Sequence, residues 1–237
     1  LMRLPLLRVA FAFSIWAFKA YADWRAKNPL PADQAAADEL ARSMLQYRVL
    51  TVQADLSEFD RLPELVAQTV GCFGRMDALV NNASSFKPTP VGTTTPQQWD
   101  DLFASNARAP FFLAQAAAPH LKATRGAIVN LVDIYAERPL AGHTVYCMAK
   151  AALLMATKSL ALELAPDVRV NAVAPGAILW AENETSEAKQ QAMLARTPLA
   201  RTGTAEEIAE AVRWLLRDAT YVTGQVIRVD GGRMRAG

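Results

Sequence analysis

Glycine, cysteine and histidine are scarce in this chain, and each shortage excludes a kind of site. No glycine occurs in residues 1–31, which excludes a glycine-rich phosphate-binding turn from that stretch. Cys72 and Cys147 are the only cysteines, too few for a disulfide scaffold and typical of a reducing compartment. His120 and His143 lack metal-ligand spacing to other residues, so no metal site is expected.

The basic charge of the chain is confined to its first residues. Residues 1–30 contain five basic side chains and one acidic side chain, a charge of +4, while the whole chain carries +2. The remainder is therefore at −2, and the pI of 8.6 is no evidence for a nucleic-acid partner. With 52% hydrophobic residues and no internal repeats, residues 31–237 are expected to form one domain.

Short apolar strand patterns alternate with helical patterns along most of the chain. This alternation predicts an α/β fold with a parallel sheet and helices on both faces. The predicted strands are 48–56, 77–81, 126–132, 168–176 and 224–232, and the predicted helices are 33–46, 58–73, 96–122, 145–165 and 204–217. The polar stretch 180–198 is expected to form a mobile lid.

Tyr146 and Lys150 lie four residues apart in a helical pattern that is apolar on most sides. Residues at i and i+4 share a helix face, so the ammonium is expected to lower the pKa of the phenol and make it a proton donor or acceptor near neutral pH. Taken alone, such a pair is most often a solvated surface pair. Here the helix is predicted to be buried, which favours a functional pair.

Asp133 follows the predicted strand 126–132 at its carboxyl end. Ligands of open α/β sheets bind beyond the carboxyl ends of the strands, so Asp133 lies where a reacting group would lie. A solvated loop carboxylate or a helix cap is the alternative reading of this residue.

Taken together, these motifs resemble the short-chain dehydrogenase/reductase family from about Asp33 to Gly232. The family usually has serine thirteen residues before its tyrosine, where this chain has Asp133. That aspartate, with the run Asn82–Phe86, resembles the pteridine reductase branch, and 176–180 resembles the substrate loop of its bacterial members. The motifs that carry the resemblance are Asp55-Leu56, Asn81-Asn82-Ala83, Asn106, Tyr146 with Lys150, Pro175-Gly176 and Asp230-Gly231-Gly232.

The resemblance implies a Rossmann-like doubly wound sheet and NADPH-dependent reduction of a small-molecule pterin. Tyr146 would supply or relay a proton, Asp133 would bind the pterin beside it, and Lys150 would hold the nicotinamide ribose. Asn106 would support a water-mediated proton path. Phe86 would cover one face of the pterin, although a core phenylalanine at a strand end is the alternative. The remaining implied cofactor contacts are Asp55 and Leu56 at the adenine, Asn82, Ala83 and Ser84 along the ribose and phosphates, and Pro175 and Gly176 at the nicotinamide.

The resemblance also implies a homotetramer, assembled through helices 96–122 and 145–165, and a cytoplasmic location with no membrane or nucleic-acid partner. A runner-up is a related reductase acting on another carbonyl or imine. A non-enzymatic alternative is a scaffold that keeps the catalytic residues but cannot hold cofactor.

Residues 1–30 depart from the family, because the strand, glycine loop and helix of the first βαβ unit are missing. The unit is expected to be incomplete, without its first two strands, and this segment to pack irregularly. Three readings compete. Arg3 and Arg8, an apolar run over 9–18 and a small-residue site at 20–22 resemble a secretory signal. That run is too short for a membrane anchor, which needs ~20 residues. We favour the third, a segment not native to the domain, such as the product of an upstream frameshift.

Overall fold

The computed structural model describes residues 9–12, 50–52, 54–178 and 187–235. The predicted helix 33–46, most of the segment 1–30 and the first half of the predicted lid lie outside these ranges. The second half of the lid contains a helix, α7 (Glu187–Ala195).

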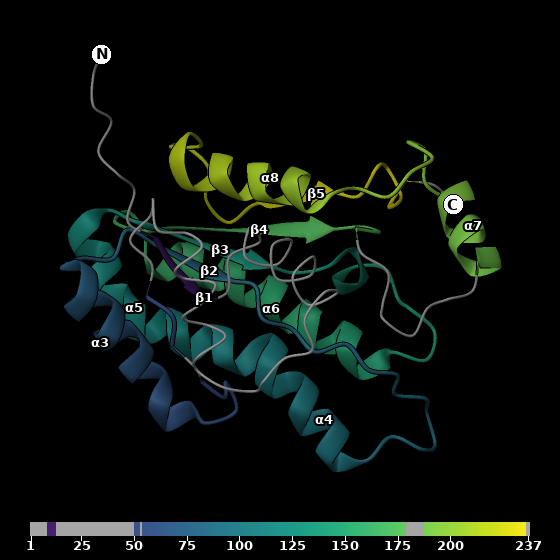
Figure 1. Cartoon of the computed structure of the whole chain (residues 1–237), viewed down its shortest axis with the longest axis horizontal. Coiled ribbons are helices and arrows are strands. Elements are labelled where there is room, and N and C mark those ends of the chain that lie inside the picture. Colours follow the sequence, from purple (N-terminus) through teal and green to yellow (C-terminus); the bar gives the residue numbers. More distant parts are fainter. Residues whose placement is uncertain (1–8, 13–49, 53, 179–186, 236–237) are drawn as a thin grey trace.

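Five parallel strands form one sheet in the order β1-β2-β3-β4-β5 (Figure 1). Every residue of β2 and β3 is buried, as expected for parallel strands covered on both faces. All five carboxyl ends meet at the same edge, because every neighbouring pair is parallel. The strands are β1 (Val9–Ala12), β2 (Ala78–Asn81), β3 (Ala127–Leu131), β4 (Arg169–Pro175) and β5 (Val226–Val229).

Helices cover both faces of this sheet, as predicted. Helix α8 (Ala205–Arg217) packs on β3, β4 and β5 from one side (Figure 1). Helices α5 (Ala109–Thr124) and α6 (Thr144–Glu163) pack on the other, with α3 (Leu62–Phe73) against α5. Helix α4 (Pro96–Phe103) begins at a capping box and runs into α5 through a π-helical turn, Ala104–Arg108.

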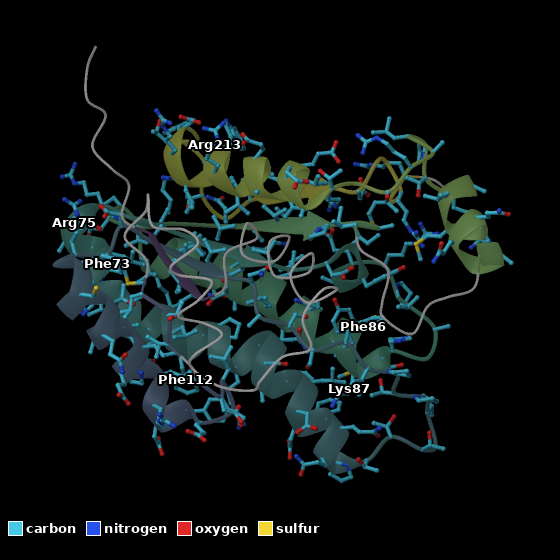
Figure 2. The ribbon with its side chains drawn as sticks, viewed as in Figure 1. Phe73, Arg75, Phe86, Lys87, Phe112 and Arg213 are labelled. Atoms are coloured by element: carbon cyan, nitrogen blue, oxygen red, sulfur yellow. The ribbon has the colours of Figure 1, made fainter. Side chains whose placement is uncertain are left out.

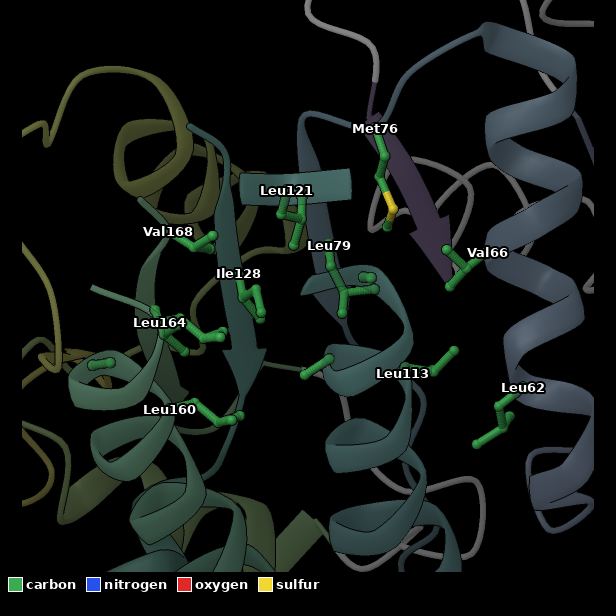
Figure 3. Close-up of a cluster of buried hydrophobic side chains, with 14 of the residues drawn as sticks. Leu62, Val66, Met76, Leu79, Leu113, Leu121, Ile128, Leu160, Leu164 and Val168 are labelled. Carbon is green, nitrogen blue, oxygen red and sulfur yellow. The ribbon is translucent and has the colours of Figure 1, made fainter. Parts of the chain in front are cut away.

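Two apolar layers stabilise the sheet from opposite sides. Successive strand residues point to opposite faces, so Leu79 and Val80 of β2 belong to different layers. The layer under α3, α5 and α6 is drawn in Figure 3 and includes Leu79, Leu113 and Ile128. The layer under α8 joins Val80 to Val212. The sheet is thus held rigidly, which fixes the positions of the residues that follow its strands.

The expectation that residues 1–30 pack irregularly, without the first strands of the fold, was wrong for Val9–Ala12. These residues pair in parallel with Ala78–Asn81 as β1. A run of four apolar residues can satisfy the exposed backbone groups of the β2 edge, which any unpaired edge strand presents.

The strand predicted over 48–56 is also wrong for the described part of that range. Residues 50–52 and 54–55 are irregular, and Asp55 begins a turn in which its carboxylate accepts a 2.8 Å hydrogen bond from the Ser57 amide. A strand needs a hydrogen-bonded neighbour, and β1 has no described strand on its outer side. β1 lies beside β2, where the strands of the first βαβ unit were expected to be missing.

Candidate active site

Asp133 and Tyr146 are joined directly at the carboxyl edge of the sheet. Asp133 follows β3 and caps a 3-10 turn, Ile134–Ala136, while Tyr146 lies in the first turn of α6. The Tyr146 hydroxyl donates a 2.7 Å hydrogen bond to Oδ2 of Asp133. Oδ1 of the same carboxylate accepts a 2.9 Å hydrogen bond from the Tyr135 amide. Asp133 is therefore both a cap and the partner of the candidate proton donor.

Burial and the neighbouring carboxylate raise the pKa of Tyr146 well above its usual range. The expectation that Lys150 lowers this pKa was wrong. The Lys150 ammonium lies 5.8 Å from the centre of the Tyr146 ring, whereas the Asp133 carboxylate is in direct contact with the hydroxyl. Tyr146 is thus a neutral phenol, able to donate a proton.

Lys150 is fully enclosed by the fold, and its desolvation lowers its pKa to about 8. Its ammonium donates a 2.9 Å hydrogen bond to the carbonyl oxygen of Leu131. Burial raises the pKa of Asp133, against hydrogen bonds from Tyr135 and Tyr146 and the charges of Lys150 and Arg233. Burial and the neighbouring positive charges thus shift the pKa of Asp133 in opposite directions.

Asn106 lies in the π-helical turn between α4 and α5 and is fully buried. Its amide nitrogen donates to the carbonyl oxygens of Ser85 and Leu102, each at 2.9 Å, and its Oδ1 accepts from the Ser84 hydroxyl at 2.8 Å. Ser84 also interacts with the Tyr146 hydroxyl and moderates the rise in the pKa of Tyr146. Asn106, Ser84, Tyr146 and Asp133 therefore lie in one polar group. Single-turn π insertions of this kind often mark functional sites.

Phe86 packs against Tyr146 in this group and is labelled in Figure 2. The residue is 45% exposed, so the reading as a core phenylalanine is wrong. It stacks on His143 at 4.5 Å between ring centres and meets Tyr146 edge-on at 4.8 Å. His143 was not among the predicted site residues; its place directly before α6 is the only sequence signal for it.

The loop that carries Phe86 is fastened to the loop before α6. The Thr89 amide donates a 2.6 Å hydrogen bond to the Gly142 carbonyl, and the Thr89 hydroxyl accepts one of 3.2 Å from the Val145 amide. The aromatic ring and the candidate proton donor are therefore held by the same short bridge.

Several predicted cofactor residues line one cavity of about 580 Å³ beside this group. It joins Asp55 and Leu56 to Ala83 and Ser84, and Asn82 directly precedes these two residues in the loop after β2. Lys87, Asp101 and Ser105 also line it; they were not among the predicted site residues, although Lys87 follows Phe86 and Ser105 precedes Asn106 in the sequence.

Pro175 and Gly176 lie at the end of β4, at the same edge of the sheet. A Cβ on Gly176 would lie 2.7 Å from the Cα of Asp230, so this glycine allows two chain segments to approach closely. Packing between β4 and the turn after β5 thus explains the glycine without a ligand.

The residues around Lys150 fit the nicotinamide half of a dinucleotide. An ammonium has three donors, and the described residues give it one hydrogen-bond acceptor, the Leu131 carbonyl. A ribose diol supplies acceptors for the other two. The pyrophosphate half would lie after β1, beyond the described residues, and the first glycine of the chain is Gly71.

A parallel sheet with a buried tyrosine and lysine at its carboxyl edge defines an oxidoreductase of the Rossmann-like class. Residues 27–233 match the family model described as enoyl-(acyl carrier protein) reductase. The chain therefore belongs to the short-chain dehydrogenase/reductase family.

Its relatives include reductases of different substrates at similar identity. Ketoacyl reductase 2 of the granaticin polyketide synthase of Streptomyces violaceoruber is 40% identical over 190 residues, covering 77% of this chain and 76% of its own. Pteridine reductase 1 of Leishmania tarentolae is 38% identical over 224 residues, covering 77% of each chain. The 3-oxoacyl-[acyl-carrier-protein] reductase FabG of Staphylococcus aureus is 38% identical, covering 76% and 75%.

A solved structure has the same fold. A short-chain alcohol dehydrogenase from Sinorhizobium meliloti superposes with a TM-score of 0.79 at 29% identity, covering 84% of this chain and 80% of that one. The Rossmann-like architecture is thus established, whereas the substrate depends on the residues of the site.

Proposed function

We propose that this protein reduces a pterin, with NADPH as the reductant. The observation that carries the proposal is the hydrogen bond between Tyr146 and Asp133. A carboxylate suits the amino group and ring N–H of a pterin, whereas the serine usual in this family suits a carbonyl oxygen. Phe86, half exposed above Tyr146, offers a flat face for a bicyclic ring.

NADPH, when bound, supplies the hydride. Lys150 would hold its nicotinamide ribose through the two ammonium donors that Leu131 leaves available. As a ring carbon of the C=N bond accepts the hydride, Tyr146 would give its proton to the nitrogen of that bond. Ser84 interacts with Tyr146 and donates to Asn106, and these two residues would support the return of a proton to Tyr146 from water. Asp133 fixes the phenol and faces the amino side of the ring.

Reduction of a 3-oxoacyl substrate is the second candidate, because ketoacyl reductases match this chain as well as a pteridine reductase does. In that reaction Tyr146 would protonate a carbonyl oxygen, and no carboxylate would be needed at residue 133.

Steady-state oxidation of NADPH with two substrates separates these functions. Dihydrobiopterin and an acetoacetyl thioester would be offered at a high, fixed NADPH concentration to the wild type and to Asp133→Ser. We expect the wild type to reduce the pterin, and Asp133→Ser to lose that activity by about 100-fold while gaining relative activity on the thioester. Turnover of the thioester without any turnover of the pterin would overturn the proposal.

We further propose that the enzyme is a cytoplasmic homotetramer. Helices α4, α5 and α6 carry exposed apolar side chains on their own outer surfaces. Phe112, labelled in Figure 2, is 37% exposed and meets the ring of Phe111 edge-on at 5.5 Å between ring centres. A second copy of the chain would cover this face with the same residues, as two-fold interfaces do. The exposed side chains are Trp99, Phe111, Phe112, Met148, Met155 and Leu162.

Helix α6 has the length and hydropathy of a membrane span, but half of its apolar window is buried in the fold. It also carries Tyr146 and Lys150, whose polar groups hydrogen-bond within the domain. The packing of α6 against the sheet accounts for its apolar character.

A further inference from the structure

The chain turns back on itself after β5 and brings its last described residues to the site. Asp230 fixes this turn: Oδ1 accepts a 2.9 Å hydrogen bond from the Gly232 amide, and Oδ2 accepts one of 2.8 Å from the Met234 amide. Gly231 and Gly232 have φ values of 62° and 86°, which favour glycine. The turn is therefore held in one conformation by hydrogen bonds and by its glycines.

Arg233 projects from this turn toward the 3-10 turn that Asp133 caps. Its guanidinium donates a 3.2 Å hydrogen bond to the Tyr135 hydroxyl, 98 residues away in sequence. Arg138 donates a 2.9 Å hydrogen bond to the Arg233 carbonyl, and Met234 packs into the apolar cluster that includes Tyr135. Three contacts thus fasten Arg233 in place.

Tyr135 connects Arg233 to the reacting pair. Its hydroxyl accepts from Arg233, and its amide donates to Oδ1 of Asp133. Oδ2 of Asp133 accepts from Tyr146, so both carboxylate oxygens are oriented. We propose that Arg233 is a positioning residue for the Asp133–Tyr146 pair, acting through Tyr135 and through its charge to keep residue 133 an oriented carboxylate.

The charges around Asp133 explain why this cation matters. The groups that face it are Tyr146 and Lys150 from α6, Tyr135 from the 3-10 turn, and Arg233 from the C-terminal turn. Burial raises the pKa of Asp133, while the charges of Lys150 and Arg233 lower it. Lys150 loses its charge as the pH rises above its pKa of about 8. Arg233 keeps its charge over the whole physiological pH range, because a guanidinium does not lose its proton there.

The test compares Arg233→Gln and Arg233→Lys with a control, Arg235→Gln, which removes an exposed arginine from the same turn. The first readout is the carboxyl titration of Asp133 by ¹³C NMR, assigned with Asp133→Asn; it needs no turnover. The second is the pH profile of kcat/KM with dihydrobiopterin, which rests on the proposed function.

Loss of a nearby cation disfavours the carboxylate, so Arg233→Gln should move the NMR midpoint and the acidic limb to higher pH by about 0.5–1 unit. Arg233→Lys should restore most of this shift, and Arg235→Gln should leave both readouts unchanged. An unshifted midpoint in folded Arg233→Gln, as judged by circular dichroism, would overturn the inference. If the wild type reduces no pterin, the proposed function fails, but the NMR midpoint still decides the role of Arg233.

Discussion

The Tyr146 hydroxyl and the Asp133 carboxylate, thirteen residues apart in sequence, share a hydrogen bond of 2.7 Å at the carboxyl edge of the sheet. This contact keeps the phenol neutral, because an adjacent negative charge opposes its ionisation. The pair therefore holds a proton ready for transfer, and Lys150 does not lower the pKa of the phenol as its spacing suggests.

Replacing Tyr146 by phenylalanine should remove this proton donor while leaving the ring that packs beneath Phe86. We expect kcat for pterin reduction to fall by about 100-fold or more, with little change in the dissociation constant of NADPH. Single-turnover kinetics and a cofactor titration measure the two quantities. A kcat close to that of the wild type would remove Tyr146 from the proton-transfer step.

Lys150 should make the stability of the cofactor-free protein depend on pH in the alkaline range. Its pKa is lowered from 10.5 to about 8 in the folded state, so between these values the unfolded chain binds more protons. Stability should therefore rise with pH from 8 to 10, by about 2 kcal/mol relative to Lys150→Met. Urea unfolding of both proteins at the two pH values tests this, and parallel pH dependences would contradict it.

Arg169 should contribute to stability through the end of α8. Its half-buried guanidinium donates to the carbonyl oxygens of Leu215, Leu216 and Ala219 at 2.6–2.9 Å. Arg169→Met would leave these acceptors without their partner, and we expect a loss of about 3 kcal/mol in the free energy of unfolding.

The matched control for this substitution is Arg213→Met, on the exposed side of α8 (Figure 2). Arg213 forms exposed ion pairs with Glu210 and Asp218, so its loss should cost less than about 1 kcal/mol. Equal losses in the two variants would refute the capping role of Arg169.

Light scattering at micromolar concentration should report a tetramer. Leu162→Glu places a charge on the exposed face of α6 and should reduce the measured mass, whereas Tyr221→Glu, at a fully exposed residue after α8, should not. A monomeric wild type would show that the apolar face of α4, α5 and α6 does not join copies of the chain.

NADPH should bind this chain weakly. Residues 1–31 contain no glycine to expose amides to a pyrophosphate, and Lys150 would contact only the nicotinamide ribose. We expect the dissociation constants of NADPH and of reduced nicotinamide mononucleotide to agree within about 10-fold by calorimetry. Micromolar affinity for NADPH alone would reveal a phosphate site in the N-terminal segment.

Local sequence pattern was sufficient for the elements around the site. The strand before Asp133 and the helix of Tyr146 could be predicted because their apolar periodicity is contained in each segment. The pairing of Val9–Ala12 with Ala78–Asn81 could not, since it depends on a partner far along the chain. The absence of a strand at the described residues 50–52 and 54–55 has the same cause.

The pKa shifts of the site residues were harder to predict from the sequence than which residues form the site. The spacing of Tyr146 and Lys150 suggested a lowered pKa for the tyrosine, but burial and Asp133 determine the opposite direction. The contribution of Arg233 is likewise invisible in sequence, because it arises from a turn 98 residues from Tyr135. Such effects follow from three-dimensional proximity, which periodicity does not encode.

The bridge between Thr89 and Gly142 has a consequence for altering substrate scope. Because it couples the Phe86 loop to the residues that introduce Tyr146, a graft of residues 84–90 from a ketoacyl reductase would arrive without its matching anchor. The acceptor loop 140–145 would then have to be transplanted with it. Chimeras that exchange both segments should acquire the substrate preference of the donor enzyme. Chimeras that exchange one loop should have a displaced aromatic ring and a low kcat.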